Sequence, residues 1–188
     1  MKTTSGIILL AAIVMVQACS NKENNTNSSA KAKFVVSGYD VPIPATVTFF
    51  NTSSNATSYK WYFGDGTTST EFNPTHTYTT IGTYFLKLVA NGPSGADSVC
   101  KVLYLSNVEP NKSSFSYFMD RCEGIPVNFS FYSLNPQSLY YAWDFGGGIT
   151  STEKNPVIQY GATGSYTIKF SSQIGGVRDT ITFGIVIN

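Results

Sequence analysis

Apolar and polar side chains alternate along most of this chain with a period of two residues. Val47 and Phe49 share one side of such a segment, and Tyr59, Trp61 and Phe63 share one side of another. Clusters of glycine, asparagine, proline and aspartate separate the segments at intervals of roughly a dozen residues. The pattern predicts short strands joined by turns, and no segment beyond the amino-terminal apolar run has useful helical periodicity. We therefore expect an all-β fold built as a sandwich.

The sequence repeats itself after a shift of 82 residues. The register holds without a gap from Pro44 to Asp97, which fall on Pro126 and Asp179. A tryptophan on a middle strand of each copy, and a Gly-x-Tyr sequence before a later strand, are typical of immunoglobulin-like sandwiches. A repeat of this length indicates two copies of one domain of about 80 residues. We predict tandem immunoglobulin-like domains at residues 34–107 and 113–188.

The amino terminus carries an apolar run behind a single lysine. Residues 7–16 are long enough for the apolar part of a secretory leader and too short to span a bilayer. The V-Q-A-C sequence that ends at Cys19 resembles the lipobox of bacterial lipoproteins, in which the chain is cut before a cysteine that receives lipid. The resemblance implies a leader at residues 1–18 and lipid attachment at Cys19. An ordinary leader with a chance cysteine is the alternative.

Composition favours a location outside the cytoplasm and disfavours nucleic-acid binding. Charged residues make up 12% of the chain, where about 25% is usual. The chain has 12 lysines and arginines against 11 acidic residues, and the leader removes Lys2, so the mature chain is neutral and offers no basic stripe to nucleic acid. Residues 20–33 hold no large apolar side chain, so we expect residues 19–33 to form a flexible tether. Ser20 after the lipidated cysteine is compatible with sorting to an outer membrane, at its cell-surface or periplasmic face.

The first repeat contains a string of residues typical of one family. W-Y-F-G-D-G at residues 61–66 is followed by N-P-T-H-T-Y at 73–78 and G-T-Y at 82–84. At these residues the chain resembles PKD domains, the immunoglobulin-like sandwiches first named from polycystin. The second repeat departs from the string at Gly147, where an aspartate belongs, and at Ile158, which replaces the histidine, so we expect a looser turn there. The motif residues with a predicted structural role are Trp61, Phe63, Gly64, Asp65, Gly66, Asn73, Pro74, His76, Tyr78, Gly82, Tyr84, Trp143, Phe145, Gly146, Gly148, Asn155, Pro156, Tyr160, Gly164 and Tyr166.

The resemblance implies a spacer or a binding module and no catalytic part. His76, the single histidine, lies in the motif where a structural hydrogen bond is expected, and Asp65 and Glu71 are turn and loop residues. We therefore predict no catalytic residues and no enzyme activity. Some PKD domains attached to collagenases bind calcium, which Asp40, Asp65 or Asp97 could ligate in the first domain. We otherwise expect no metal and no cofactor.

Strand alternation turns several apolar side chains of the first repeat outward on three neighbouring strands. They are Tyr62, Phe85, Val89, Val102 and Tyr104. Their counterparts in the second repeat are mostly polar or small: Asp144, Thr167, Ser171, Gly184 and Val186. A contiguous apolar patch usually marks an interface. Three interpretations stay open: the seam between the two domains, a face that binds a protein or glycan, or an error of register that buries some of these residues.

Two cysteines remain after Cys19, namely Cys100 and Cys122. An oxidising compartment favours a disulfide between them, and their spacing does not suit a zinc site. Such a bridge would close a short loop, contribute about 3 kcal/mol in the chain-entropy model and fix the angle between the domains. Related domains often pair cysteines within one domain, whereas here each repeat keeps one.

These features together predict a non-catalytic protein of the cell envelope, anchored in the membrane by its lipid. Its tandem PKD domains would serve adhesion by binding a protein or a carbohydrate. A structural spacer or accessory subunit of a larger envelope complex is the first alternative, and a divergent hydrolase is the most remote one.

Overall fold

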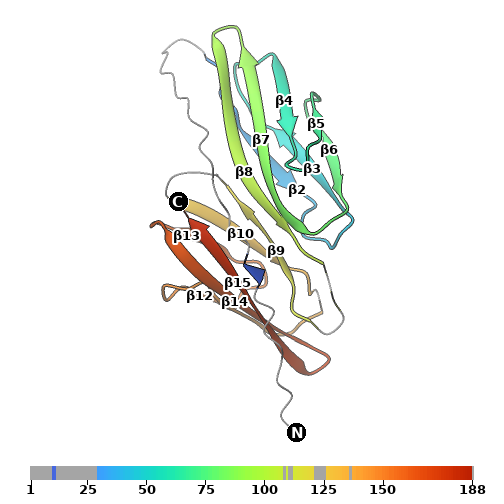
Figure 1. The fold of residues 1–188 in the computed structure, drawn as a ribbon, viewed down its shortest axis with the longest axis vertical. Coiled ribbons are helices and arrows are strands. Elements are labelled where there is room, and N and C mark those ends of the chain that lie inside the picture. The colour runs from blue at the N-terminus through green and yellow to red at the C-terminus, as the bar shows by residue number, and fades with distance from the viewer. Residues whose placement is uncertain are drawn as a thin grey trace.

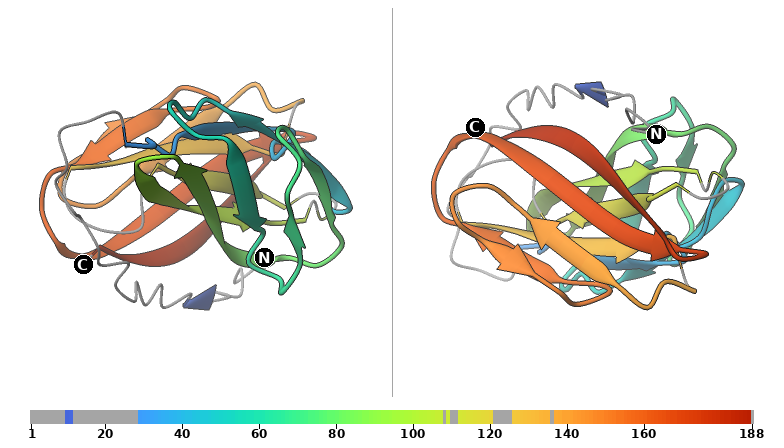
Figure 2. Two further views of the ribbon diagram at one scale, coloured as in Figure 1. Left: turned by 90° about the horizontal axis from the view of Figure 1, so that it is seen from above. Right: turned by 90° about the horizontal axis from the view of Figure 1, so that it is seen from below.

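The computed structural model describes residues 10–11, 29–107, 109, 112–120, 126–135 and 137–187. Every regular element within these residues is a β-strand, which confirms the all-β prediction (Figure 1). In this described part of the chain, no helix has the length and apolar character needed to cross a membrane. Within these described residues the strands form a three-stranded, a five-stranded and a seven-stranded sheet, seen along the long axis of the molecule in Figure 2.

The first sandwich, residues 29–107, packs two antiparallel sheets face to face. Alternation is clearest in the middle of the smaller sheet, where Ala45, Val47 and Phe49 are buried and the side chains between them are not. The larger sheet covers this face with Trp61, and both sheets contribute to one core. The smaller sheet has the order β2 (Phe34–Ser37), β3 (Ala45–Asn51), β6 (Thr75–Tyr78), and the larger contains β5 (Thr68–Ser69), β4 (Ser58–Tyr62), β7 (Gly82–Gly92) and β8 (Gly95–Leu105).

The second sandwich, residues 112–187, repeats this plan around Trp143. Its first sheet contains β9 (Phe115–Met119), β10 (Val127–Ser133) and β13 (Val157–Tyr160), and its second contains β12 (Thr150–Ser151), β11 (Tyr141–Asp144), β14 (Gly164–Ile174) and β15 (Val177–Ile187). A two-residue strand from the predicted leader, β1 (Leu10–Ala11), pairs in parallel with β15.

One continuous sheet joins the two sandwiches. The last strand of the first sandwich, β8, pairs antiparallel with the first strand of the second, β9. The pairing matches Val102 with Met119, Leu103 with Phe118, and Tyr104 with Tyr117. The resulting seven-stranded sheet has the order β13-β10-β9-β8-β7-β4-β5, and Figure 1 shows β8 and β9 side by side where the sandwiches meet.

The last four residues of β8 and all of β9 are buried on both faces. Leu103, Leu105 and Phe118 belong to the core of the first sandwich. The side chains that alternate with them, including Val102 and Tyr104, belong to the core of the second. The face of the shared sheet that lies outside the first sandwich therefore lines the inside of the second.

The folded part of the chain begins earlier than the sequence predicts. We expected a flexible tether up to residue 33, but Ala30 is buried and Lys31 forms a β-bridge with Ser54. The backbone N–H of Ala32 also donates to the carboxylate of Asp97 at 2.9 Å. The tether prediction is therefore wrong for residues 30–33, because backbone pairing and one small buried side chain hold a segment that lacks large apolar residues.

Candidate functional site

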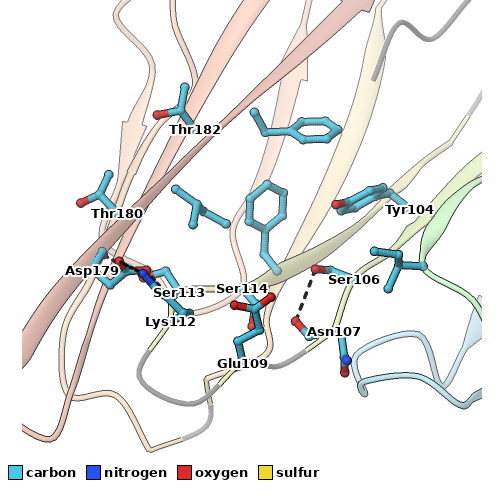
Figure 3. Close-up of a pocket in the computed structure, with 14 residues that line it drawn as sticks. Tyr104, Ser106, Asn107, Glu109, Lys112, Ser113, Ser114, Asp179, Thr180 and Thr182 are labelled. Atoms are coloured by element: carbon cyan, nitrogen blue, oxygen red, sulfur yellow. Dashed lines mark hydrogen bonds and ion pairs between the residues drawn. The ribbon is translucent and has the colours of Figure 1, made fainter. Parts of the chain in front are cut away.

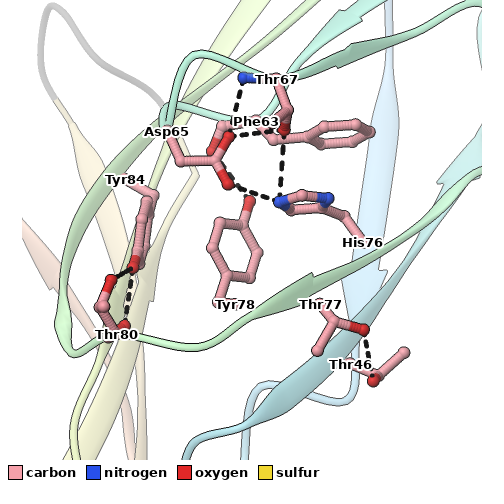
Figure 4. A network of polar contacts seen from close by, with 9 residues as sticks. All are labelled: Thr46, Phe63, Asp65, Thr67, His76, Thr77, Tyr78, Thr80 and Tyr84. Carbon is pink, nitrogen blue, oxygen red and sulfur yellow. Dashed lines mark hydrogen bonds and ion pairs between the residues drawn. The ribbon is translucent and has the colours of Figure 1, made fainter.

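The turn of the first W-Y-F-G-D-G string is held by a network around Asp65 (Figure 4). Its Oδ1 accepts hydrogen bonds from the backbone N–H of Thr67 at 3.0 Å and the Thr67 hydroxyl at 2.6 Å. Its Oδ2 lies 2.6 Å from Nε2 of His76, whose ring stacks on Phe63 with centroids 4.5 Å apart. Burial acts to raise the pKa of Asp65, but the hydrogen bonds from Thr67 and the neighbouring His76 outweigh it and lower the pKa. His76 thus braces a turn.

The motif glycine in this turn has a steric role. Gly64 adopts a φ of 86°, and a Cβ there would lie 2.6 Å from the backbone nitrogen of Phe85. Only glycine tolerates both the left-handed backbone and the close approach to β7. The turn therefore holds β4 and β7 together at one end of the larger sheet.

The aromatic motif residues make the same hydrogen bonds in both repeats. The indole N–H of Trp61 donates to the carbonyl of Glu71 at 2.8 Å, and that of Trp143 donates to Glu153 at 2.9 Å. The corresponding tyrosine bonds, at 2.9 and 2.7 Å, run from Tyr78 to the carbonyl of Phe63 and from Tyr160 to that of Phe145. Burial raises the pKa of both tyrosines. These residues support the two cores.

The second repeat compensates in part for its missing aspartate. Gly146, Gly147 and Gly148 all adopt positive φ angles, so the turn is made of three successive glycines. Asp144, one residue before Phe145, accepts a hydrogen bond from the N–H of Gly146 at 2.9 Å. A carboxylate thus still caps this turn, from a different position.

The structure divides the five outward apolar residues between two environments. Val102 and Tyr104 are buried in the core of the second sandwich, where Tyr104 stacks on Tyr117. Tyr62 and Phe85 are 43% and 40% exposed, and Val89, the fifth residue, is partly buried. A single exposed face made of all five residues does not exist, because β9 and the second sandwich cover the β8 part of it.

A tyrosine that the sequence analysis missed strengthens the seam between the sandwiches. Tyr39, in the loop after β2, donates from its hydroxyl to the hydroxyl of Tyr132 at 2.9 Å, and their rings meet edge to face at 4.7 Å. Its carbonyl accepts a 2.6 Å hydrogen bond from the Ser116 hydroxyl. Burial and the bond to Tyr132 raise the pKa of Tyr39. A loop carries no periodicity, so no pattern in the sequence signals these contacts.

Asp97 and Asp179, near the start of the last strand of each sandwich, accept hydrogen bonds from the backbone where the chain enters that sandwich. Asp97 accepts the N–H of Ala32, and Asp179 accepts the N–H of Ser113 at 2.7 Å. Asp40, the third calcium candidate besides Asp65 and Asp97, is exposed. Among the residues that the structure describes, no group of three histidines, cysteines or acidic residues could hold a metal ion.

Cys100 is disulfide-bonded in the structure and packs against the second core. Its predicted partner, Cys122, lies outside the described residues, as does the predicted lipid-bearing Cys19. The pairing of Cys100 with Cys122 stays a prediction.

A pocket of about 230 Å³ opens at the junction of the two sandwiches (Figure 3). The end of β8, the described residues 106, 107, 109 and 112–115, and the first half of β15 line it, and we call it the junction pocket. Its lining combines aromatic and aliphatic side chains with hydroxyl groups and three charged groups. Such an arrangement can bind a small ligand with polar and apolar surfaces. The residues that line it are Ile81, Tyr104, Ser106, Asn107, Glu109, Lys112, Ser113, Ser114, Phe115, Asp179, Thr180, Ile181, Thr182 and Phe183.

Comparison with known proteins identifies the family of the first sandwich. Residues 24–106 match the family model described as PKD domain, which confirms the resemblance for this repeat. A 41-residue stretch is 56% identical to collagenase ColA of Bacillus cereus, and a stretch of the same length is 49% identical to collagenase ColQ1 of Bacillus cereus strain Q1. Each stretch makes up 22% of this chain and 4% of the collagenase, so the chain spans a small fraction of these relatives.

Solved structures similar to the chain include two isolated PKD domains. The PKD1 domain of Vibrio anguillarum Epp is 25% identical, and the match covers 43% of this chain and 96% of that domain with a TM-score of 0.37. The PKD1 domain of the Vibrio cholerae metalloprotease PrtV is 34% identical, with 42% and 95% covered and a TM-score of 0.34. A structure from a study of carbohydrate-binding modules of the β-sandwich superfamily covers 87% of this chain and 86% of its own, at 15% identity and a TM-score of 0.44.

Proposed function

We propose that this chain is a non-catalytic binding protein of the cell envelope, held to an outer membrane by lipid on Cys19. Its ligand is a protein or a carbohydrate that is captured through the sandwich domains. The V-Q-A-C sequence supports the anchor, and lipid on a single cysteine anchors a protein stably when it carries two or more acyl chains. The mass of the amino-terminal peptide tests this part: a diacylglyceryl group on Cys19 is expected, and an unacylated terminus contradicts it.

The observation that carries the binding role is the exposed aromatic pair on the first sandwich. Tyr62 on β4 and Phe85 on β7 lie on the same face of adjacent strands, and each is about two-fifths exposed. Their counterparts on the second sandwich are Asp144 and Thr167. Because the two repeats share the fold, the fold alone does not require aromatic side chains at these positions. Exposed aromatic groups offer large rigid contact surfaces to a ligand.

The non-catalytic part of the proposal is supported by the contacts of His76. Its ring is stacked on Phe63, and its Nε2 is engaged by Asp65 within a turn that glycine geometry already constrains. The same position in the second repeat is the apolar Ile158. These contacts give His76 a structural role, so its presence does not require a catalytic one.

A rigid spacer is the second candidate, and the shared seven-stranded sheet favours it. A joint made by strand pairing and two-sided burial fixes the direction of one sandwich relative to the other. A spacer would project a partner at a set distance from the membrane and would bind no soluble ligand.

The whole chain, produced and processed in a bacterial host, is tested on a glycan array and in a pull-down from the native envelope. Tyr62→Ala and Phe85→Ala are expected to weaken ligand capture roughly tenfold each, the effect of losing a contact worth about 1.4 kcal/mol. Both variants should lower the melting temperature no more than loss of a phenylalanine of similar exposure elsewhere, because each side chain is about two-fifths exposed. Phe50→Ala, which removes a phenylalanine of similar exposure (42%) from the opposite sheet, is the matched control.

Unchanged capture by both variants would contradict the proposed binding face. Co-purification of a fixed envelope partner, with no glycan or soluble ligand bound and no effect of either substitution, would favour the spacer.

A further inference from the structure

The strand β15 presents the longest open edge in the described part of the chain. The other strands at the margins of the sheets are short: β5 and β12 have two residues each, and β2, β6 and β13 have four. β15 has eleven residues, and within the described residues only the two-residue β1 pairs with its side away from β14. We call this side the β15 edge. Folds usually keep edge strands short, because a long row of unpaired backbone groups invites another strand.

The β15 edge also lacks the residues that usually protect an open strand. The last eight residues of β15, T-I-T-F-G-I-V-I, contain no charged residue and no proline. Charged side chains and proline on an edge strand discourage pairing with another chain. The length and composition of this edge therefore point to a partner that covers it.

The equivalent edge of the first sandwich is already covered by a strand. The repeat of 82 residues places Gly184 of β15 on Val102 of β8, and β8 pairs with β9 from Val102 to Tyr104. On β15 the same place holds β1, which pairs Ala11 with Gly184 in the parallel direction (Figure 1). In both sandwiches, then, this position accepts an added strand. Because β1 belongs to the predicted leader, removal of the leader would leave the β15 edge open.

Gly184 lies within the β15 edge although the described residues around it do not require a glycine. Its φ lies outside the left-handed region, and a Cβ built on it would meet no heavy atom within 4 Å. The pairing of β14 with β15 runs without a bulge from one end of the hairpin to the other. A glycine inside a regular strand often marks the close approach of a ligand or of another backbone. Gly184 thus leaves room for a neighbouring strand.

A strand added at the β15 edge would lie over the first sandwich. Ring centroids show how the two sheets of the second sandwich are superposed: Phe170 of β14 is 5.9 Å from Phe115 of β9. Phe183 of β15 is 5.0 Å from Tyr104 of β8. One step from β14 to β15 therefore corresponds to one step from β9 to β8 in the shared sheet. The next position beyond β15 accordingly lies over β7.

The face of β7 at that position carries an exposed aromatic side chain. Phe85 is the cross-strand partner of Val102, so both side chains point to the same side of the shared sheet. Val102 is fully buried, whereas Phe85 is 40% exposed. The inward side chains of an added strand would cover Phe85. A second copy of the chain does not fit here, because its β15 would bring the β8 beneath it into the space that β7 occupies.

We propose that the β15 edge binds an extended segment of a partner protein by strand addition, with apolar side chains at alternate positions packed on Phe85. In this mode of recognition, main-chain hydrogen bonds supply affinity and the alternate side chains supply specificity. The bound segment is uncharged in its middle, because residues 180–187 offer it no ionic partner. This inference rests on the proposed function and narrows its ligand from a protein or a carbohydrate to an extended peptide.

The test selects peptides from a phage-displayed library of random linear sequences on the whole chain after removal of its leader. The enriched peptides are expected to be apolar at alternate positions and uncharged in the middle. The most enriched one, made synthetically, should slow hydrogen exchange of backbone amides within residues 183–187. Gly184→Lys should fold as the parent does, because its Cβ has open space, and should raise the Kd of that peptide roughly tenfold. Thr167→Lys, at the exposed cross-strand neighbour on β14, is the matched control and should leave the Kd unchanged.

Three results would overturn the assignment of the β15 edge. They are a library that yields no enriched peptide, slowed exchange only outside residues 183–187, and equal peptide binding by Gly184→Lys and the parent. If Tyr62→Ala and Phe85→Ala still weaken capture on the array or in the pull-down in any of these cases, the binding function stands and only the edge is wrong. Enriched peptides that carry charges throughout would contradict the apolar ligand class. If no peptide, glycan or envelope protein is captured, the proposed function fails as well.

Discussion

Asp65 shows at the scale of one residue how a motif becomes a structural support. Its carboxylate satisfies the Thr67 backbone N–H, the Thr67 hydroxyl and the imidazole of His76 within a single turn. Each of these hydrogen bonds favours the ionised carboxylate, which is why the pKa of Asp65 is lowered despite the opposing effect of burial. The turn should therefore be sensitive to acid.

The pH dependence of stability tests this network. A lowered carboxyl pKa contributes stability in full above the unfolded-state pKa of about 3.9, and the contribution is lost as the pH falls through the folded-state pKa. Asp65→Asn should therefore lower the free energy of unfolding by about 1 kcal/mol at pH 7 and flatten its fall between about pH 5 and pH 2. Urea unfolding across this range measures both effects. Glu71→Gln neutralises an exposed carboxylate of the same sandwich and should keep the parental dependence of the unfolding free energy on pH. The same pH dependence for Asp65→Asn and the parent would contradict the role given to Asp65.

At the scale of the element, β8 and β9 are the strands that determine the architecture. Each alternates between two cores, so the side chains that face outward from one sandwich fill the interior of the other. Val102 is fully buried in the second core although it belongs to the first repeat by sequence. The stability of the second sandwich therefore depends on side chains of the first.

The effect of Val102→Ala tests this dependence. Loss of two buried methyl groups should lower the free energy of unfolding by about 2 kcal/mol. Urea unfolding that is followed by the fluorescence of Trp143, in the second core, should report the full loss. Val89→Ala removes the same atoms from the same face of the sheet, but from β7 and outside that core, so it should cost under about 1 kcal/mol. Similar losses for the two variants would contradict the two-sided burial of β8.

The strands and motif contacts were predictable because they depend on local signals. Period-two alternation predicts which side of each strand is buried. The motif occurs in both repeats, and the same indole hydrogen bond is accordingly found at Trp61 and at Trp143. The β8–β9 pairing was not predicted, because alternation indicates which side chains face out of one sandwich and not what covers them. A signal was nevertheless present: residues 102–105 are apolar without alternation, which is typical of a strand buried on both faces.

At the scale of the whole molecule, two sandwiches form one mechanical unit. The shared sheet, the Tyr39–Tyr132 contact and the two-sided strands leave no independent boundary between the cores. The same joint creates the junction pocket and sets the exposed aromatic pair at a fixed position relative to it. Loss of the joint would therefore disturb stability and the candidate sites together.

Fluorine NMR of the chain labelled with 5-fluorotryptophan tests this unity most directly. The sequence contains two tryptophans, and each lies in the core of one sandwich, so one sample reports on both halves during urea unfolding. The resonances of Trp61 and Trp143 should convert from native to unfolded positions at the same urea concentration and with the same slope. Two separate transitions, with one tryptophan still native while the other is unfolded, would contradict the claim that the two sandwiches unfold as a single cooperative unit.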